Sequence, residues 1–376
     1  MTERKETVVV TGASAGLGRA IAIEFAKHRA QVGLLARGEQ GLEGAAAEVR
    51  ASGGSPLILP VDVADADAVE NAAATVENQL GPIDVWVNNA MVSVFSPVKE
   101  MKAEEYKRVT EVTYLGVVNG SLAALRRMLP RNRGKIVQVG SALAYRSIPL
   151  QSAYCAAKHA IVGFTDALRC ELIHDHTSVS VSVVHMPALN TPQFGWVKSR
   201  LRNKAQPVPP IFEPEVGARA VFWAAHHDRG EVYVGGSTVK AIVGNKIAPR
   251  LLDHYLGHTG YESQQTDRPE DPERPDNLWE PLDQDRDAGT HGSFDTCSQS
   301  HSFELWADLR RAKIVAGIGL STLALGLLLR SFRKSSDPGM RPPRLPIDGC
   351  FRRKEPMAPA RKRRTHRQLQ SGVWLS

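Results

Sequence analysis

The chain has 376 residues, 42% of them hydrophobic, and a formal net charge of +7, which is enough for one large domain with additional segments. The charge belongs to the C-terminus: residues 331–376 hold twelve Lys/Arg and three Asp/Glu, a net of +9, and residues 1–330 carry the remaining −2. A nearly neutral body gives no reason to expect nucleic-acid binding. The four cysteines form no CxxC pair, so we expect no metal site, a reducing compartment and a cytoplasmic location.

The first predicted strand leads into a glycine-rich turn. Residues 7–10 are a β-branched run, and a helical pattern covers 16–28. Between them, Gly12-Ala-Ser-Ala-Gly16-Leu-Gly18 would let the backbone approach a pyrophosphate, with the amides of the helix N-terminus as donors. The spacing differs from the GxGxxG fingerprint. Taken alone, the turn is as consistent with a structural loop as with a cofactor site.

Strand and helix patterns then alternate. Residues 31–36 read as a strand, 42–49 as a helix and 57–59 as a strand, and a further strand covers 85–88. This alternation predicts a parallel sheet with helices on both faces. Ligands in such sheets bind at the carboxyl ends of the strands.

The residue after the second strand bears on the choice of cofactor. An acidic residue there would accept hydrogen bonds from the adenosine ribose and favour NAD. This chain has Arg37 instead, whose guanidinium could bind a 2′-phosphate. We therefore predict NADP as the preferred cofactor, with NAD as the alternative. The other interpretation of Arg37 is an ordinary solvated loop residue.

Three residues have the spacing of a proton-transfer site. Ser141 follows the apolar run 136–140, and Tyr154 and Lys158 lie four apart in a segment with a helical pattern, so both project from one face. A phenol is a poor base near neutrality because its reference pKa is about 10. A nearby ammonium would lower the pKa of Tyr154 and make it a general acid and base. Tyr-x-x-x-Lys also occurs by chance on helix surfaces, so the trio alone is weak evidence.

Four motifs in order make the signal specific. They are Thr11-Gly12-x3-Gly16-x-Gly18, Asn88-Asn89-Ala90, Ser141 and Tyr154-x3-Lys158. Over residues 5–240 the chain resembles the short-chain dehydrogenase/reductase family. The resemblance implies a Rossmann-like, doubly wound α/β fold that binds a nicotinamide dinucleotide. It also implies that Tyr154 donates or accepts the proton, Lys158 lowers its pKa and holds the nicotinamide ribose, and Ser141 orients the substrate oxygen.

The resemblance also implies a set of cofactor contacts. These are Gly12, Ser14, Gly16, Leu17, Gly18, Arg37, Asp62, Val63, Asn89, Tyr154, Lys158, Leu189 and Thr191. An Asp after a strand can alternatively cap the following helix, so Asp62 has a second interpretation. Two positions depart from the family: Met91 replaces a usual glycine, and Thr113 replaces an asparagine that supports a proton path.

Three segments follow the predicted domain of residues 1–260. Residues 261–303 are acidic and contain several prolines, which predicts a linker or a surface-wrapping arm. Residues 304–330 predict an apolar helix, and its uncharged part, 314–329, is either a membrane anchor or a buried or dimer-forming helix. Residues 331–376 predict a basic, disordered tail.

These features predict an NADP-preferring oxidoreductase that interconverts a secondary alcohol and a ketone. If residues 314–329 attach the chain to the cytoplasmic face of a membrane, a lipophilic substrate is favoured. We also expect a homo-oligomer. The alternative is a catalytically weak or inactive dinucleotide sensor or scaffold that is tethered by its C-terminal region.

Overall fold

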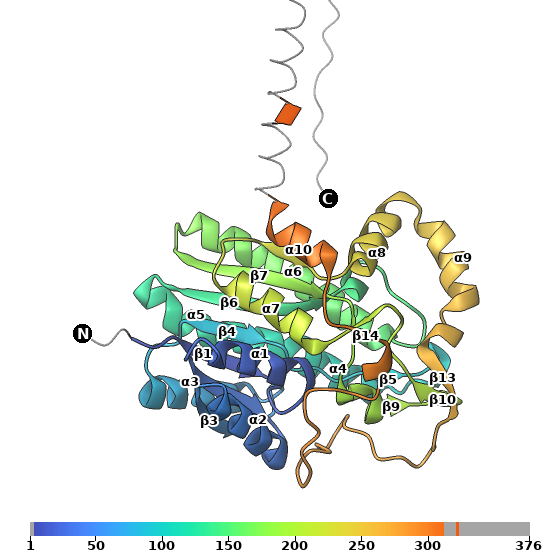
Figure 1. Ribbon diagram of the computed structural model, residues 1–376, viewed down its shortest axis with the longest axis horizontal. Coiled ribbons are helices and arrows are strands. Elements are labelled where there is room, and N and C mark those ends of the chain that lie inside the picture. The colour runs from blue at the N-terminus through green and yellow to red at the C-terminus, as the bar shows by residue number, and fades with distance from the viewer. Residues whose placement is uncertain (1–3, 312–320, 323–376) are drawn as a thin grey trace, which may run out of the picture. The chain divides into compact units, whose positions relative to one another are not determined.

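A seven-stranded parallel sheet forms the centre of the protein (Figure 1). The computed structural model describes residues 4–311 together with 321 and 322. The strand order is β12-β7-β6-β4-β1-β2-β3. The strands are β1 (Thr7–Thr11), β2 (Gln31–Ala36), β3 (Ser55–Pro60), β4 (Val85–Asn88), β6 (Gly134–Ser141), β7 (Val179–Met186) and β12 (Glu231–Tyr233).

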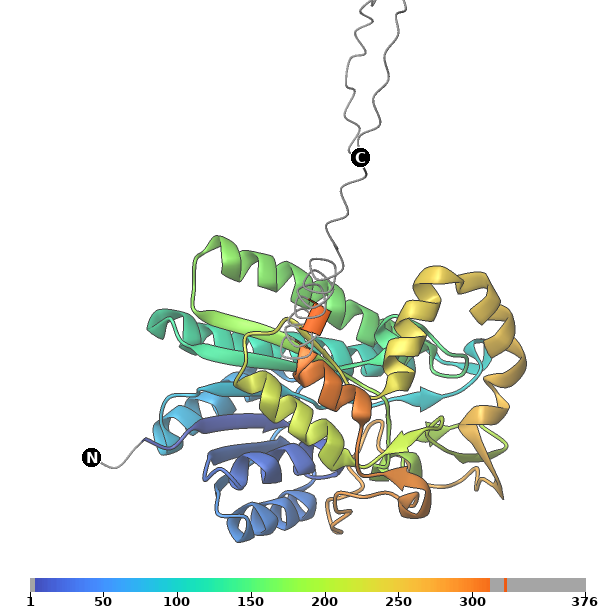
Figure 2. The ribbon, with the colours of Figure 1, turned by 45° about the horizontal axis from the view of Figure 1, so that its top comes forward.

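Helices cover both faces of the sheet (Figures 1 and 2). On one face lie α1 (Gly16–Ala26), α2 (Glu39–Ala51) and α7 (Pro214–Ala225). On the other lie α3 (Ala66–Leu80), α4 (Ala103–Thr110), α5 (Gly116–Met128) and α6 (Ser152–His174), with the π-helical turn η2 (Glu111–Leu115) between α4 and α5.

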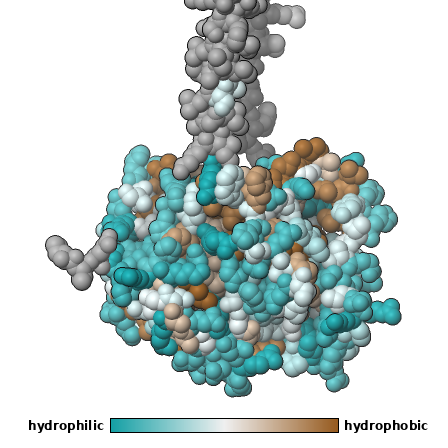
Figure 3. Space-filling view, viewed as in Figure 1, coloured by the Kyte–Doolittle hydropathy of each residue, from teal (hydrophilic) through white to brown (hydrophobic). Residues whose placement is uncertain are grey.

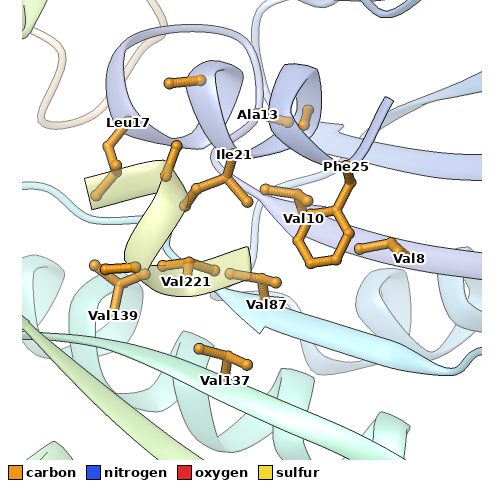
Figure 4. Packing of buried hydrophobic residues seen from close by; sticks show 14 of the residues in the cluster. Val8, Val10, Ala13, Leu17, Ile21, Phe25, Val87, Val137, Val139 and Val221 are labelled. Atoms are coloured by element: carbon orange, nitrogen blue, oxygen red, sulfur yellow. The ribbon is translucent and has the colours of Figure 1, made fainter. Parts of the chain in front are cut away.

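Alternating side chains of β1 show why the two cores are separate. Val8 and Val10 pack with Ile21 and Phe25 of α1 in one cluster, as Figure 4 shows. Val9 belongs to the opposite cluster, because successive strand residues point to opposite faces. The expected Rossmann-like doubly wound sheet is therefore confirmed.

The order of the strands places the binding edge. From β1 the chain builds β2 and β3 on one side, and β4, β6, β7 and β12 on the other. A crevice for ligands forms where the order reverses, at the carboxyl ends of β1 and β4. The glycine-rich turn follows β1, and Asn89 follows β4, so both lie at this crevice.

Smaller elements surround that edge. A helical hairpin of α8 (Gly236–Ile247) and α9 (Pro249–Thr259) follows β12, and α10 (Phe303–Leu309) ends the described continuous chain (Figure 1). Short strands pair as β5 (Val94–Phe95) with β9 (Lys198–Ser199), β10 (Asn203–Ala205) with β13 (Gln265–Pro269), and β11 (Ile211–Phe212) with both β8 (Ala188–Leu189) and β14 (Ser298–Gln299). The 3₁₀ turns are η1 (Val98–Glu100), η3 (Leu129–Arg131), η4 (Ala142–Ala144), η5 (Pro192–Gly195), η6 (Glu262–Gln264) and η7 (Asp295–Cys297).

Residues 270–297, between β13 and β14, are called the arm below. The arm is fastened to the body at several points. Asn277 N donates to Trp196 O at 2.9 Å, and Lys198 Nζ pairs with Asp276 at 2.8 Å. Further along, Asp287 pairs with the buried Arg19 of α1.

The C-terminal predictions fall mostly outside the described residues. The chain divides into two units, Met1–Ala316 and Gly317–Ser376, and the sheet and its helices belong to the first. The predicted apolar helix beyond α10, with its segment 314–329, lies outside the described residues except for 321 and 322, and the basic tail lies wholly outside them. Across residues 4–311 and 321–322, no helix is long and apolar enough to cross a membrane.

Candidate active site

A cavity of about 710 Å³ opens at the carboxyl edge of the sheet. This volume is typical of sites for small molecules and cofactors. Every residue that we predicted for the site lines it: Gly12, Ser14, Gly16, Leu17, Gly18, Arg37, Asp62, Val63, Asn89, Ser141, Tyr154, Lys158, Leu189 and Thr191. The structure therefore brings together motifs that lie up to 179 residues apart in the chain, from Gly12 to Thr191.

The glycine-rich turn needs its glycines for close backbone packing. Gly12 has a φ of +67°, in the left-handed region that favours glycine. A Cβ built on Gly18 would lie 2.0 Å from Gly12 O, so α1 could not start this close to the turn with any larger residue. The Thr11 hydroxyl accepts hydrogen bonds from the amides of Asn89 and Ala90, at 2.9 and 3.1 Å, and this joins the ends of β1 and β4.

Ser141, Tyr154 and Lys158 meet at the cavity wall. Ser141 ends β6, and Tyr154 and Lys158 project from the first two turns of α6. Lys158 Nζ lies 5.5 Å from the centre of the Tyr154 ring and donates to Val139 O at 2.7 Å. The Ser141 Oγ accepts a hydrogen bond from Leu143 N at 3.1 Å, and the Ser141 side chain also hydrogen-bonds Tyr154.

Burial affects the pKa values of both Tyr154 and Lys158. Burial raises the pKa of Tyr154 well above its usual value, and the neighbouring Ser141 side chain lowers it only in part. Burial also lowers the pKa of Lys158 to about 8. Burial is the largest influence on the Tyr154 phenol, and the lowering of its pKa by Lys158 stays a prediction. Tyr154 therefore carries its proton at neutral pH, as an unperturbed phenol also does.

At the end of β2, Arg37 contacts the arm. Its two terminal nitrogens donate to Trp279 O and Asn277 O, each at 2.7 Å. The side chain is partly buried, and burial lowers its pKa. Arg37 is therefore neither solvated nor free, and its guanidinium faces the cavity with the arm beside it.

Asp62 has local hydrogen bonds. Its Oδ1 accepts from Ala64 N at 3.0 Å, and its Oδ2 accepts from Arg108. Although burial raises the pKa of Asp62, these bonds hold it below the usual value. The neighbouring Asp65, whose side chain accepts from Ala68 N, is the cap of α3. Asp62 thus stabilises the loop after β3 and lines the cavity as well.

The two departures from the family pattern have different settings. Met91 lines the cavity. Thr113 is fully buried in the π-helical turn η2, and its hydroxyl bonds both Val92 N and Val92 O, at 3.1 and 2.9 Å. The hydroxyl is therefore occupied in fixing the loop after β4.

The sequence did not indicate part of the cavity wall. The arm contributes residues near Arg37, and the α8–α9 hairpin contributes residues near its mouth. From the arm these are Asn277, Pro281, Leu282 and Asp283, and from the hairpin Ser237, Lys240, Ala241, Leu252, Tyr255 and Leu256. Neither segment carries a motif; the only signal was the acidic composition of the arm. In the described residues, no cluster of three or more His, Cys, Asp or Glu side chains could hold a metal ion.

Comparisons with known proteins agree with this geometry. A family model described as short chain dehydrogenase matches residues 6–200. The uncharacterized oxidoreductase YxnA of Bacillus subtilis (strain 168) is 31% identical over 320 residues, which are 84% of this chain and 89% of that protein. Dehydrogenase/reductase SDR family member 7 of Homo sapiens is 37% identical over 169 residues, 44% of this chain and only 50% of that protein.

Two solved structures are also similar. One is an alcohol dehydrogenase from the archaeon Thermococcus sibiricus complexed with 5-hydroxy-NADP, with a TM-score of 0.54 and 27% identity. The other is a metagenomic short-chain oxidoreductase in complex with NADP, with a TM-score of 0.52 and 29% identity. Each match covers 61% of this chain and 96% of the other. The family predicted from the four motifs is confirmed, and this chain belongs to the short-chain dehydrogenase family of oxidoreductases.

Proposed function

We propose that this protein is an NADP-preferring reductase that interconverts a ketone and a secondary alcohol. The observation that carries the proposal is the meeting of Ser141, Tyr154 and Lys158 in one cavity with the glycine-rich turn. A proton donor, an oxygen-orienting hydroxyl and a surface for a pyrophosphate are the parts that carbonyl reduction requires.

Each residue of the trio has a defined task. The Ser141 hydroxyl donates a hydrogen bond to the carbonyl oxygen, and Tyr154 transfers its proton to that oxygen as charge develops there. Lys158, held by Val139 O, fixes the ribose side of the site and supplies a cation beside the Tyr154 ring. A bound dihydronicotinamide supplies the hydride.

NADP as the preferred cofactor rests on two arguments. Both solved neighbours described above are complexes with NADP or a hydroxylated NADP. In this chain a guanidinium, that of Arg37, stands where an acidic residue would favour NAD. The body residues that would hold the cofactor are those of the glycine-rich turn, Arg37, the Asp62–Val63 loop, Asn89, Lys158, Leu189 and Thr191.

The substrate end of the cavity supports an apolar substrate. Its lining includes Val92, Phe95, Ile148, Phe194, Val208, Leu252 and Leu256. On the α8–α9 hairpin, exposed apolar side chains continue from the cavity lining: Tyr255, which lines the cavity, is 60% exposed, and Ile247 and Leu251 are 77% and 69% exposed. Figure 3 shows hydrophobic residues as brown atoms at the upper right of the body, where Figure 1 places α8 and α9. A lipophilic carbonyl compound would partition onto such a surface before it enters.

The test is NADPH oxidation by the full chain with a panel of aliphatic, steroid-like and retinoid-like carbonyl compounds. At least one compound should be reduced. Tyr154→Phe should lower kcat by about 10²- to 10⁴-fold. Tyr261→Phe, on an exposed tyrosine away from the cavity, is the matched control and should retain full activity.

Two results would contradict the proposal. Turnover by Tyr154→Phe at the wild-type rate would rule out a proton-transfer role for Tyr154. Tight NADPH binding without turnover of any compound would instead favour the dinucleotide sensor.

A further inference from the structure

One carboxylate of the arm lies inside the proposed cofactor site. Asp283 lines the cavity and is 6% exposed. Its oxygens lie against the start of α2: a Cβ built on Gly38 would be 2.0 Å from Oδ1, and one built on Gly41 would be 2.6 Å from Oδ2. Within residues 4–311, the structure gives this carboxylate no hydrogen bond and no ion pair.

Several donors near Asp283 bind backbone carbonyls of the arm. Both terminal nitrogens of Arg37 bind the carbonyls of Trp279 and Asn277. The first amides of α2 bind backbone carbonyls of the arm: Gly41 N donates to Asp283 O at 3.0 Å, and Gln40 N donates to Gln284 O at 3.3 Å. The arm therefore fills the helix N-terminus with its backbone and leaves the Asp283 side chain directed at the cavity.

The Asp283 carboxylate interacts favourably with the charge of the nearby Arg37 guanidinium, but the described residues give it no hydrogen-bond donor. The position of Asp283 indicates which donors it would meet. It lies beside residues 37 and 38, directly after β2 and about 20 residues beyond the glycine-rich turn. In dinucleotide-binding sheets the adenosine ribose sits at this place, and an acidic residue there accepts hydrogen bonds from its hydroxyls.

We propose that Asp283 determines how the enzyme discriminates between the two nicotinamide dinucleotides, through a carboxylate supplied by the arm instead of by the end of β2. This inference rests on the proposed dinucleotide-binding function. The carboxylate accepts hydrogen bonds from an unmodified ribose and repels a 2′-phosphate, whereas Arg37 attracts that phosphate. Attraction of the 2′-phosphate by Arg37 of the body and its repulsion by Asp283 of the arm then oppose each other. The preference for NADP depends on how far the attraction exceeds the repulsion.

The test uses adenosine fragments that reach only this end of the site. The full-length chain is titrated with ADP and with 2′,5′-ADP by calorimetry. Asp283→Asn should tighten 2′,5′-ADP by about ten- to a hundredfold and should not tighten ADP, because the charge opposes only the phosphate of the first ligand and accepts hydrogen bonds from the unmodified ribose of the second. Asp285→Asn removes the same charge from an exposed arm residue outside the cavity and should change neither ligand.

A second variant keeps the charge but moves it. Gly38 has a φ of −81°, which any residue can adopt, so Gly38→Ala should fold. Its methyl group would lie 2.0 Å from Asp283 Oδ1 and 2.8 Å from the Asp283 backbone carbon, so it would move this part of the arm with its carboxylate and should also shift selectivity towards 2′,5′-ADP. If both ligands bind the wild-type chain and neither variant changes their ratio, the role of Asp283 is refuted while the proposed function stands. If the wild-type chain binds neither ligand, both fail.

Discussion

Replacing Lys158 with methionine should separate the chemistry of a buried ammonium from its effect on folding. Lys158 is 2% exposed, and burial lowers its pKa from 10.5 to about 8. A shift of about 2.5 units corresponds to a destabilisation of about 3 kcal/mol at pH 7. Methionine has a similar length and no charge, and it loses one hydrogen bond, worth about 1 kcal/mol. We therefore expect Lys158→Met to raise the free energy of unfolding by about 2 kcal/mol and to lower kcat at least about a hundredfold.

The dependence on pH gives a sharper test. Between about pH 8 and pH 10.5 the unfolded chain keeps a proton that the folded chain has already released from Lys158, so the stability of the wild-type protein rises with pH in this window. The advantage of the variant should accordingly shrink by about 2 kcal/mol between pH 7 and pH 9.5. Urea unfolding of the full chain at both pH values measures this difference.

Lys135 is the matched control. It is 7% exposed, burial lowers its pKa to about 8 as well, and it lies at the start of β6, away from the cavity. Its ammonium donates to Ser180 Oγ and His227 O, at 3.1 and 3.3 Å. Lys135→Met should show the same change in pH dependence with unchanged kcat. The reasoning is refuted if the stability advantage of Lys158→Met is independent of pH, or if that variant remains active.

Three further predictions concern the turn, the arm and the core. Gly18→Ala should abolish NADPH binding, measured by fluorescence titration, because its methyl group would meet Gly12 O. Gly163→Ala is the control and should bind NADPH normally, because nothing lies within 4 Å of the added atom. Asp287→Ala should speed proteolysis of the arm, because it removes a partner of Arg19, and equal cleavage of wild type and variant would count against this fastening. Burial lowers the pKa of His185 to about 4, so between pH 6.5 and pH 4 the unfolded chain binds a proton that the folded chain does not, and the free energy of unfolding falls by about 3 kcal/mol. His185→Phe should remove this contribution to the pH dependence, measured by urea unfolding. An unchanged dependence of the free energy of unfolding on pH would contradict the prediction.

The sequence was informative where the structure is local. The strand that ends at Thr11, its glycine turn and the following helix are neighbours in the chain, so their pattern predicts both the fold and the phosphate end of the cavity. Tyr154 and Lys158 are four residues apart on one helix, and their shared face follows from helical geometry alone.

The arm and the pKa of Tyr154 were not predictable in this way. The arm binds Arg37 through the backbone carbonyls of Asn277 and Trp279, and a backbone contact leaves no residue pattern to recognise. The pKa of Tyr154 depends on burial by segments distant in the chain, which spacing does not report. Its neighbour Lys158 was identified from the sequence, but the size of the desolvation effect was not.

The most direct test of the proposed chemistry follows a deuterium label. NADPH carrying deuterium at both positions of C4 of the dihydronicotinamide is mixed with a ketone and the full chain, and the alcohol is analysed by mass spectrometry. The account predicts one deuterium on the carbinol carbon with the wild-type protein, and labelled alcohol formed at least about a hundredfold more slowly with Tyr154→Phe. Alcohol formed without the label, or labelled alcohol formed equally by the variant, would contradict proton transfer from Tyr154 coupled to hydride transfer in this cavity.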